Sequence, residues 1–455
     1  MTKGLFKKTW SMVLMLALYG FLPTDHVRPA LSQDQKVVAN GISIGTKINN
    51  ANWRQYEQFM TEGLKTLFAG TSYWHMNDAV EIEVGPTKHI PLPAPYVADA
   101  AKVGGHTTLA QTADGGFVPY GYTVGLPFPE APGSDPSIAG QKIYWNNFFR
   151  PAPRVEAAPN CSYIIDEYGN ATKTGDQIAV ASQIAYLSDP PFPREEKENG
   201  GYWYAGYLEQ TAPEQGKYFA ILVLSPKNPT KLDEQYEYVP SLRRSLRISQ
   251  AARCAPIFGT DFTLEEFNDG PPRQGNMFKI EYLGEKKILA LMHAKPKSFG
   301  KTCAFPNQPD PQYYYQGDRN RIPFPKPDAG EWEVRDAYVV KMTRLPSLAT
   351  GYCYGKRVLY LDKENYFPLS TDIWDINDKL YKSILMFESP SHIPTLRSDD
   401  QILGITGNSV VFGVNFQDSH VSIFVGMAPC VDGQCDGFLD VSRYASPAGL
   451  MRIVK

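Results

Sequence analysis

Alternation of apolar and polar residues is the most regular pattern in the chain, and it recurs in short segments from residue 162 onward. Successive side chains of a strand point to opposite faces, so this alternation predicts antiparallel strands with one buried face. The chain has neither a strand–helix alternation nor a glycine-rich phosphate loop, which argues against a doubly wound parallel sheet. The expected strands are Ser162–Ile165, Gln177–Ser182, Tyr218–Leu224, Gln235–Val239, Lys279–Leu283, Ala337–Met342, Arg357–Asp362, Pro368–Trp374, Ser409–Val414 and Val421–Val425.

Successive strands with short turns form a meander, and Asp362-Lys-Glu-Asn supplies one such turn. A strongly curved meander has a concave face, and apolar side chains on that face make a natural cavity for an apolar ligand. We therefore predict a mainly β (α+β) protein: a curved antiparallel half-barrel with packed helices and a long irregular N-terminal segment.

Helical spacing appears only before the strands. Apolar residues at this spacing predict one amphipathic helix over Asn50–Phe68, with Asn50 or Asn52 as its cap. Residues 84–140 are rich in proline and glycine and are expected to be irregular, and Lys142–Arg150 is expected to form a short buried helix.

The first residues have the pattern of a targeting signal. Lys3, Lys7 and Lys8 precede an apolar run from Trp10 to Leu22, which is short for a membrane-spanning helix. We expect residues 1–32 to be a signal peptide, 33–160 a helical and irregular wrapping segment, and 161–455 the sheet domain. An uncleaved N-terminal anchor is the alternative.

Composition and charge narrow the function. Hydrophobic residues make up 43% of the chain and charged residues 20%, as in a globular protein. The 45 Lys and Arg residues are balanced by 48 Asp and Glu residues, for a net charge of −3. Nucleic-acid binders usually carry a clustered basic excess, so we expect no nucleic-acid partner.

Six cysteines in a chain with an export signal predict disulfides. Cys430 and Cys435 bracket a turn-prone Val-Asp-Gly-Gln and are the candidate pair for a local loop. Buried free thiols are the alternative, and metal binding is disfavoured because no histidines lie near cysteine pairs.

The motifs for catalysis are absent. The chain has no Gly-x-Ser-x-Gly elbow, and its seven histidines lack metal-ligand spacing. Asp372, Asp375 and Asp378 flank Trp374, but carboxylates at this spacing are usually solvated turn residues. We expect no catalytic residues, no metal and no cofactor, hence a protein that is not an enzyme.

Six blocks of residues, in order, carry a resemblance to a known family. They are Tyr122-Thr-Val-Gly-Leu-Pro-Phe-Pro, Tyr238-Val-Pro-Ser-Leu-Arg-Arg, Phe267-Asn-Asp-Gly with Lys279-Ile-Glu-Tyr-Leu-Gly-Glu-Lys-Lys, Trp332-Glu-Val-Arg-Asp-Ala-Tyr-Val-Val, Lys356-Arg-Val-Leu-Tyr-Leu-Asp-Lys-Glu and Ser446-Pro-Ala-Gly-Leu-Met-Arg. In these blocks the chain resembles an exported bacterial family of unknown function, domain-of-unknown-function family 1329.

The resemblance implies a fold of the LolA/LolB type, a curved half-barrel that binds acyl chains and is closed by helices. It also implies handling of lipids or other hydrophobic molecules in the periplasm, and a location at the periphery of the outer membrane is an expectation of the same resemblance. Neighbouring genes of the family suggest a resistance-nodulation-division (RND) exporter and an outer-membrane protein as partners. The alternatives are a structural adaptor subunit of an envelope transporter without a ligand of its own and, less favoured, a periplasmic hydrolase.

Candidate ligand-binding residues are of two kinds. Arginines near a cavity mouth could hold an anionic head group, whereas pairing with nearby carboxylates is the structural alternative. Apolar and aromatic side chains could line the cavity, whereas core packing is their alternative. The candidates are Arg243, Arg244, Leu222, Trp332, Tyr338 and Trp374.

Overall fold

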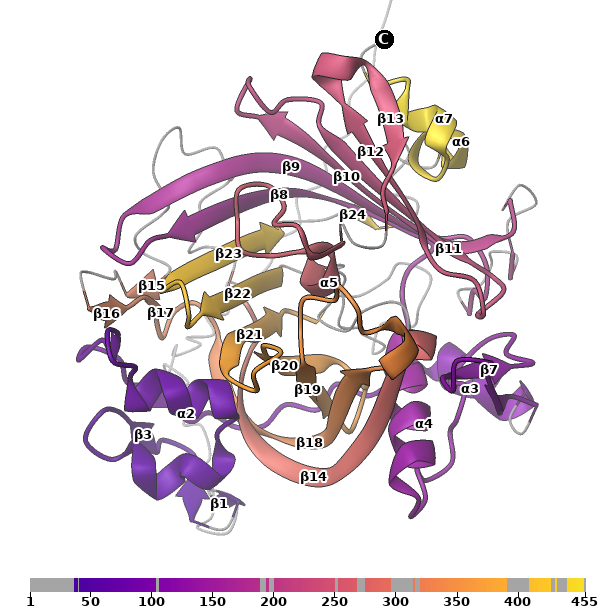
Figure 1. The fold of residues 1–455 in the computed structure, drawn as a ribbon. Helices are drawn as coiled ribbons and strands as arrows, with labels where there is room; N and C mark the ends of the chain where they lie inside the picture. The colour runs from indigo at the N-terminus through magenta and orange to yellow at the C-terminus, as the bar shows by residue number, and fades with distance from the viewer. Residues whose placement is uncertain are drawn as a thin grey trace, which may run out of the picture. The chain divides into compact units, whose positions relative to one another are not determined.

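The alternating segments come together in one antiparallel sheet in the computed structural model of the chain (Figure 1). The structure describes residues 37–39, 41–103, 106–188, 194–195, 200–249, 253–267, 275–295, 314–315, 320–390, 409–426, 430–431 and 440–453. The chain divides into two units, residues 1–36 and 37–455, and all described residues belong to the second. The expected signal peptide, 1–32, lies outside the described residues.

The large sheet has fourteen strands, which are β8 (Val155–Ile165), β9 (Ala171–Gln183), β10 (Tyr202–Ala212), β11 (Ala220–Pro226), β12 (Glu234–Val239), β13 (Arg244–Arg247), β14 (Phe278–Met292), β18 (Glu331–Arg344), β19 (Lys356–Asp362), β20 (Pro368–Trp374), β21 (Leu380–Glu388), β22 (Ser409–Asn415), β23 (His420–Gly426) and β24 (Cys430–Val431). Their order is β13-β12-β11-β10-β9-β8-β23-β22-β21-β20-β19-β18-β14, and β24 pairs separately with β8. The predicted fold class, mainly β with a large curved antiparallel sheet and packed helices, is confirmed.

The helices and short strands lie around this sheet. They are β1 (Val37–Ala39), β2 (Ile42–Ser43), β3 (Lys47–Ile48), η1 (Trp53–Phe59), α2 (Glu62–Ala69), β4 (His75–Met76), β5 (Ile82–Glu83), α3 (Ala94–Val103), β6 (Thr108–Gln111), β7 (Phe117–Tyr120), α4 (Pro136–Phe148), η2 (Pro240–Leu242), α5 (Leu264–Phe267), η4 (Gly275–Met277), β15 (Tyr314–Tyr315), β16 (Arg321–Ile322), β17 (Phe324–Pro325), η6 (Pro346–Leu348), α6 (Val441–Tyr444) and α7 (Pro447–Leu450).

The single helix predicted over Asn50–Phe68 is wrong. The segment forms the 3-10 helix η1 and then α2, with Met60 extended between them. The Thr61 side chain accepts a hydrogen bond from the Leu64 backbone N–H and so caps α2, whereas Asn52 makes no side-chain cap.

Residues 84–140 are more regular than expected. They contain α3 and the β6–β7 hairpin, and α4 begins at Pro136 rather than near Lys142. The Asp135 carboxylate accepts from the backbone N–H groups of Ser137 and Ile138, and Pro136 stands in the first turn. An acidic cap followed by proline is a strong helix start, so this boundary is set locally.

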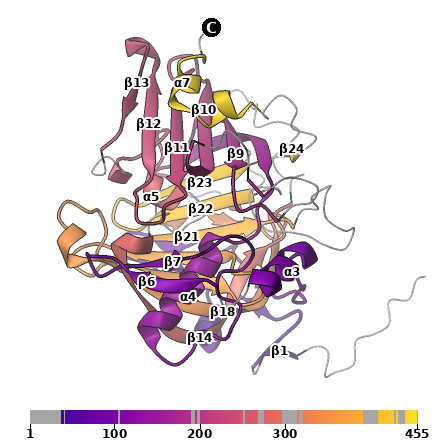
Figure 2. The ribbon, with the colours of Figure 1, turned by 90° about the vertical axis from the view of Figure 1, so that its right-hand side faces the viewer.

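Different helices cover different parts of the sheet. Side chains of η1 and α2 pack with β21–β23 and β8, and those of α4 pack with β14, β18 and β19. The C-terminal helices α6 and α7 cover β9–β12, where Tyr444 and Leu450 contact the same cluster as Leu222 and Leu224. Figures 1 and 2 show α7 beside β12.

The helix α5 lies inside the curve of the sheet (Figure 1). Phe258, Phe262 and Leu264 of this segment join a core cluster that also holds Ile288, Met292, Ile384 and Met386 from β14 and β21, and Leu208, Ile221 and Val223 from β10 and β11. One inserted segment therefore contacts both halves of the sheet.

Candidate ligand pocket

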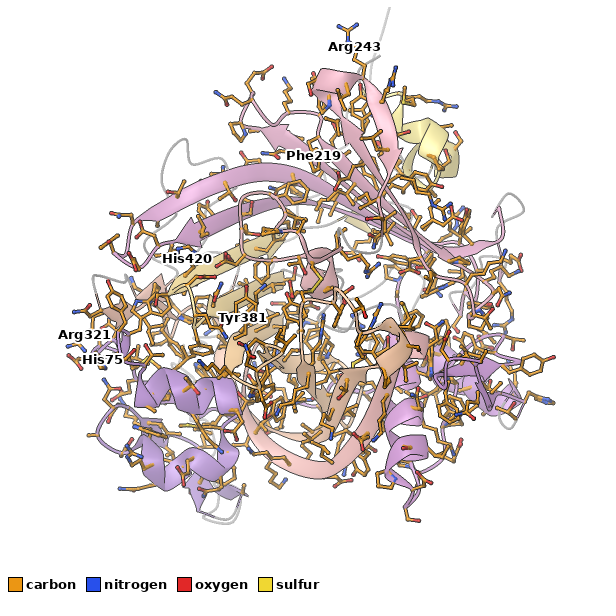
Figure 3. All side chains as sticks on the ribbon, viewed as in Figure 1. His75, Phe219, Arg243, Arg321, Tyr381 and His420 are labelled. Carbon is orange, nitrogen blue, oxygen red and sulfur yellow. A yellow bond between two sulfur atoms is a disulfide. The ribbon has the colours of Figure 1, made fainter. Side chains whose placement is uncertain are left out.

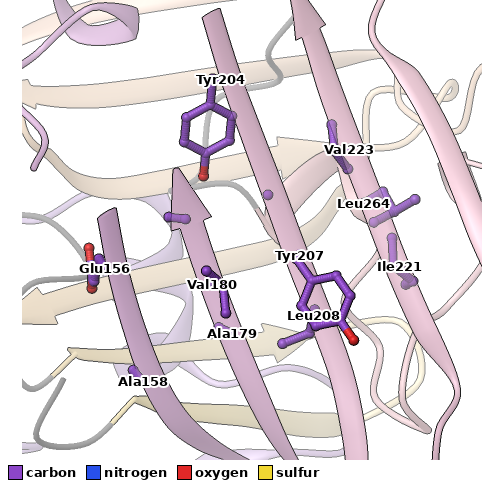
Figure 4. Close-up of a pocket in the computed structure, with 12 residues that line it drawn as sticks. Glu156, Ala158, Ala179, Val180, Tyr204, Tyr207, Leu208, Ile221, Val223 and Leu264 are labelled. Carbon is purple, nitrogen blue, oxygen red and sulfur yellow. The ribbon is translucent and has the colours of Figure 1, made fainter. Parts of the chain in front are cut away.

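A pocket lies on one face of β8, β9, β10 and β11 (Figure 4). Most residues that line the pocket form two rows across the four strands, because strand pairing places them opposite one another. One row is Ala158, Ala179, Leu208 and Ile221, and the other is Glu156, Ala181, Gly206 and Val223. Val180, Tyr204, Tyr207 and Leu264 complete the lining.

Small side chains create this space. Alanine or glycine occupies four of the eight positions in the two rows. The pocket encloses about 550 Å³ that no protein atom occupies, part of it open to solvent. Pockets for small molecules have mostly apolar walls, and the walls of this pocket are mostly apolar too.

Two polar groups interrupt the apolar lining. Glu156 lies at one end of the second row and is 3% exposed. Tyr204 stands beside Gly206, where an added Cβ would lie 3.3 Å from the Tyr204 ring. The charged lining group is therefore a carboxylate, and it faces the space next to Ala181.

Leu264 reaches the pocket from α5, which is held by buried charges. Glu265 accepts hydrogen bonds from Arg253 Nε at 2.5 Å, Arg357 Nη2 at 2.9 Å and the Tyr352 hydroxyl at 2.6 Å. Burial would raise the pKa of Glu265, but the positive charges of Arg253 and Arg357 hold this pKa below its usual value. An ionised carboxylate between two guanidinium groups fixes the helix against β19.

The neighbouring Glu266 is bound in the same way. It accepts from the Thr263 backbone N–H at 2.5 Å and from the Tyr354 hydroxyl, and Lys382 Nζ lies 3.8 Å away. Lys382 also donates to the Asp261 backbone carbonyl at 2.6 Å. The segment that carries Leu264 is thus tied to β21 as well as to β19.

A disulfide fastens the same segment covalently. Cys254 and Cys353 are bonded across 99 residues of sequence, with their Cα atoms 5.7 Å apart. Cys254 follows Arg253, and Cys353 lies between Tyr352 and Tyr354, so the bond stands within the ion-pair network. The expectation of at least one disulfide is confirmed, and Cys161 is disulfide-bonded as well. Cys435 lies outside the described residues, so the Cys430–Cys435 pair stays a prediction.

The six predicted ligand-binding residues lie outside the pocket lining. Leu222 is fully buried on the opposite face of β11 and packs under α6 and α7. Trp332 is in the core cluster beneath η1 and α2, with its ring 5.9 Å from that of Phe324. Tyr338 stacks on Tyr366. These side chains occupy three different clusters.

The remaining candidates lie at the surface. Trp374 is partly exposed, and Lys356 Nζ lies 4.7 Å from its ring centroid. Arg243 and Arg244 are exposed at the turn between β12 and β13, and Arg243 points away from the body of the protein (Figure 3). The two arginines are therefore at the tip of a hairpin and not among the residues that line the pocket.

Sequence analysis missed every residue of the pocket. Ala179 and Ala181 lie inside a segment that was predicted to be a strand, but Tyr202–Ala212, which supplies Gly206 and Leu208, was not predicted at all. A signal exists in the spacing Ala-x-Ala in β9 and Gly-x-Leu in β10. It becomes informative only when the pairing of the two strands is known.

The acidic residues near Trp374 do not converge. Asp372 is fully buried and accepts from the Ser383 hydroxyl and from the backbone at the start of α2, and burial raises its pKa to about 6. Asp375 and Asp378 lie in the exposed turn after β20. Among the described residues, no group of acidic, histidine and cysteine side chains is arranged to hold a metal ion. In the same part of the chain, no helix has the length and apolar character needed to cross a membrane.

With the fold and the pocket described, the chain can be compared with known proteins. The family model for DUF1329, a family of unknown function, matches residues 47–422. The chain belongs to this family. No curated protein matches it.

Three solved structures are similar in part. A DUF1329 family protein from Desulfovibrio piger is 13% identical, with a TM-score of 0.45 over 68% of this chain and 100% of the other. A putative outer membrane lipoprotein-sorting protein domain from Vibrio parahaemolyticus is 14% identical, with a TM-score of 0.42 over 67% of this chain and 97% of the other. A LolA superfamily protein from Nitrosomonas europaea is 10% identical, with a TM-score of 0.36 over 67% and 97%.

Proposed function

We propose that this protein binds a hydrophobic molecule in the pocket of β8–β11 and carries it within the cell envelope. The observation that carries the proposal is the lining itself: two rows of small and apolar side chains on adjacent strands, closed by Leu264 of α5. A sheet face of this kind has no structural need for alanine and glycine. Their use keeps space free for a ligand.

The energetics of such a pocket suit reversible binding. Each methylene removed from water contributes roughly 0.8 kcal/mol. The binding free energy therefore grows with the number of methylenes that the pocket covers, less the cost of association. A ligand that is only partly covered can also be released, as a carrier requires.

The location is proposed on separate grounds. The Cys254–Cys353 disulfide supports a compartment outside the cytoplasm, since disulfides persist in oxidising surroundings. Together with the basic and apolar N-terminal residues, it supports the periplasm, and a place beside the outer membrane fits a carrier. An RND exporter and an outer-membrane protein remain the proposed partners.

The adaptor function is favoured by one observation. Much of the concave side is filled by α5 and by the core side chains of β14 and β18–β21, whereas the described pocket lies at β8–β11. An adaptor would need no such cavity, and filling it would leave an adaptor unaffected. A variant with a filled pocket would therefore distinguish the two functions experimentally.

The test is binding of N-phenyl-1-naphthylamine, an uncharged fluorescent hydrophobe, to the purified protein. Ala179→Leu with Ala181→Leu should fill both rows and weaken binding more than tenfold, while Thr172→Leu, an exposed position on the same strand, should leave it unchanged. Equal binding by the filled variant, or no binding by the unmodified protein, would reject the carrier function.

Native mass spectrometry of protein purified from its own host is the complementary measurement. A bound hydrophobic compound that is absent from the filled variant would identify the ligand class. The melting temperature of each variant controls for misfolding, because two added leucines that do not fit their surroundings would lower the melting temperature.

A further inference from the structure

The hairpin of β12 and β13 combines positive charge with exposed leucines. Residues 239–247 contain three arginines and no acidic residue. Leu242 is 55% exposed and Leu246 is 43% exposed. Arg243, Arg244 and Arg247 are exposed beside them. We refer to residues 242–247 as the hairpin tip.

The hairpin tip lies at the border of the sheet. The strand β13 is the terminal strand in the sheet order and pairs only with β12. Figure 3 shows Arg243 projecting outward beyond the rest of the hairpin. No other part of the described chain covers these side chains, so they can meet a flat surface without rearrangement.

The charges of the tip are little compensated. Among the described residues, neither Arg243 nor Arg244 forms an ion pair, while Arg247 Nη2 lies 3.5 Å from Glu234 Oε1. Glu237, on the partner strand, is half-buried. Two arginines are therefore available for an anionic surface.

Charged edge strands commonly protect a sheet from pairing with another chain. That role requires arginines alone and gains nothing from exposed leucines, which would promote association instead. Arginine next to leucine suits a phospholipid surface: guanidinium groups bind lipid phosphates, and the leucines enter the boundary between head groups and acyl chains.

We propose that the hairpin tip docks the protein on anionic phospholipid membranes. The proposal is independent of the ligand pocket, whose lining includes no residue of the tip. A docked protein would hold its cargo close to the bilayer that supplies or receives it. A protein partner that adds a strand to β13 is the competing outcome of the test.

The experiment is flotation of the purified protein with vesicles of phosphatidylcholine alone or with one quarter phosphatidylglycerol. Binding is expected only to the anionic vesicles and should weaken at high salt. Each basic residue near such a surface strengthens binding about fivefold. Arg243→Glu with Arg244→Glu should therefore weaken it more than tenfold, and Leu242→Ser with Leu246→Ser should weaken it less.

The turn after β20 provides a matched control. Ile376 is 76% exposed there and Lys379 is exposed too, but Asp375 and Asp378 balance the charge. Ile376→Ser with Lys379→Glu should bind vesicles as the unmodified protein does. Equal loss in the control, or undiminished binding in the arginine variant, would overturn the proposal. Self-association of the arginine variant with vesicle binding intact would assign the arginines to edge protection and overturn it as well.

Discussion

The two halves of the sheet differ in how their faces are filled. In β8–β11, alanine and glycine stand opposite one another in register and leave a pocket. In β14 and β18–β21, Ile288, Met292, Ile384 and Met386 fill the equivalent space. Both halves belong to one antiparallel sheet, so the size of the side chains in each row determines where a cavity exists.

The two halves also differ in polar content. The filled half receives the charged network of α5, in which Arg357 is 1% exposed, and the hollow half receives only Leu264 of this helix. The charged network holds α5 through Glu265, and Leu264 of the same helix lines the pocket. The charged network and the candidate ligand pocket are therefore in different halves, and this separation can be tested.

The largest effect is expected from Arg357→Met. This change leaves Glu265 buried with one of its two guanidinium partners lost. Removing one member of a buried ion pair costs about 3–5 kcal/mol, so the free energy of unfolding should fall by this amount in urea denaturation. A loss below about 1 kcal/mol would mean that the network does not fix α5.

Breaking the disulfide should have the next largest effect. Cys254→Ser with Cys353→Ser removes a crosslink that spans 99 residues. Disulfides typically contribute about 2–4 kcal/mol, mainly by restricting the unfolded chain. Thermal unfolding with and without a reductant measures the loss, and the double variant should no longer respond to the reductant at this site.

Two glycines sharpen the comparison between dense and hollow regions. At Gly140 of α4 an added Cβ would lie 2.7 Å from the Tyr282 backbone nitrogen, whereas at Gly206 it would meet only the Tyr204 ring, at 3.3 Å. Gly140→Ala should cost about 1–3 kcal/mol through overpacking, and Gly206→Ala should stay within about 1 kcal/mol because the ring can move into the pocket. Equal melting temperatures would contradict the contrast.

The smallest effect concerns pH. Burial raises the pKa of Asp372 to about 6, well above its value in the unfolded chain. The folded state therefore binds the proton more tightly, and the stability that this adds is complete at low pH and lost as pH rises through 6. Between pH 5 and pH 7 the unfolding free energy should fall by about 1 kcal/mol through this group. In Asp372→Asn this part of the decrease should be absent.

Local patterns in the sequence predicted most of the sheet. All ten predicted strand segments lie in or overlap strands of the structure, because alternation directly reports one buried face. Four strands of the large sheet were missed. They are β10, where aromatic and polar residues are mixed, β21, whose run Ile384–Phe387 is apolar on both faces, and the short strands β13 and β24. Strands buried on both sides lose the alternation on which the prediction rests.

The candidate ligand pocket could not be predicted because it depends on strand register. Local patterns in the sequence point to large aromatic residues, such as Trp332 and Tyr338, but these side chains pack with the core clusters. The pocket consists of positions where side chains are small, and these positions become neighbours only through the pairing of four strands. An alanine or a glycine in a single strand does not indicate a pocket until the pairing of that strand is known.

The pairing of β8 with β23 has a consequence for how the protein folds. The strand β8 is the first strand of the large sheet along the chain, and β23 is the last one in its continuous order. These two strands pair with each other, and Ile165 lies opposite Val421. A chain made from its N-terminus can build β8–β13 as a local meander, but one edge of β8 stays open until residues 420–426 appear. Open edges recruit other strands, and contacts between distant residues form slowly. The time for which the nascent chain is prone to aggregate is therefore set by β23.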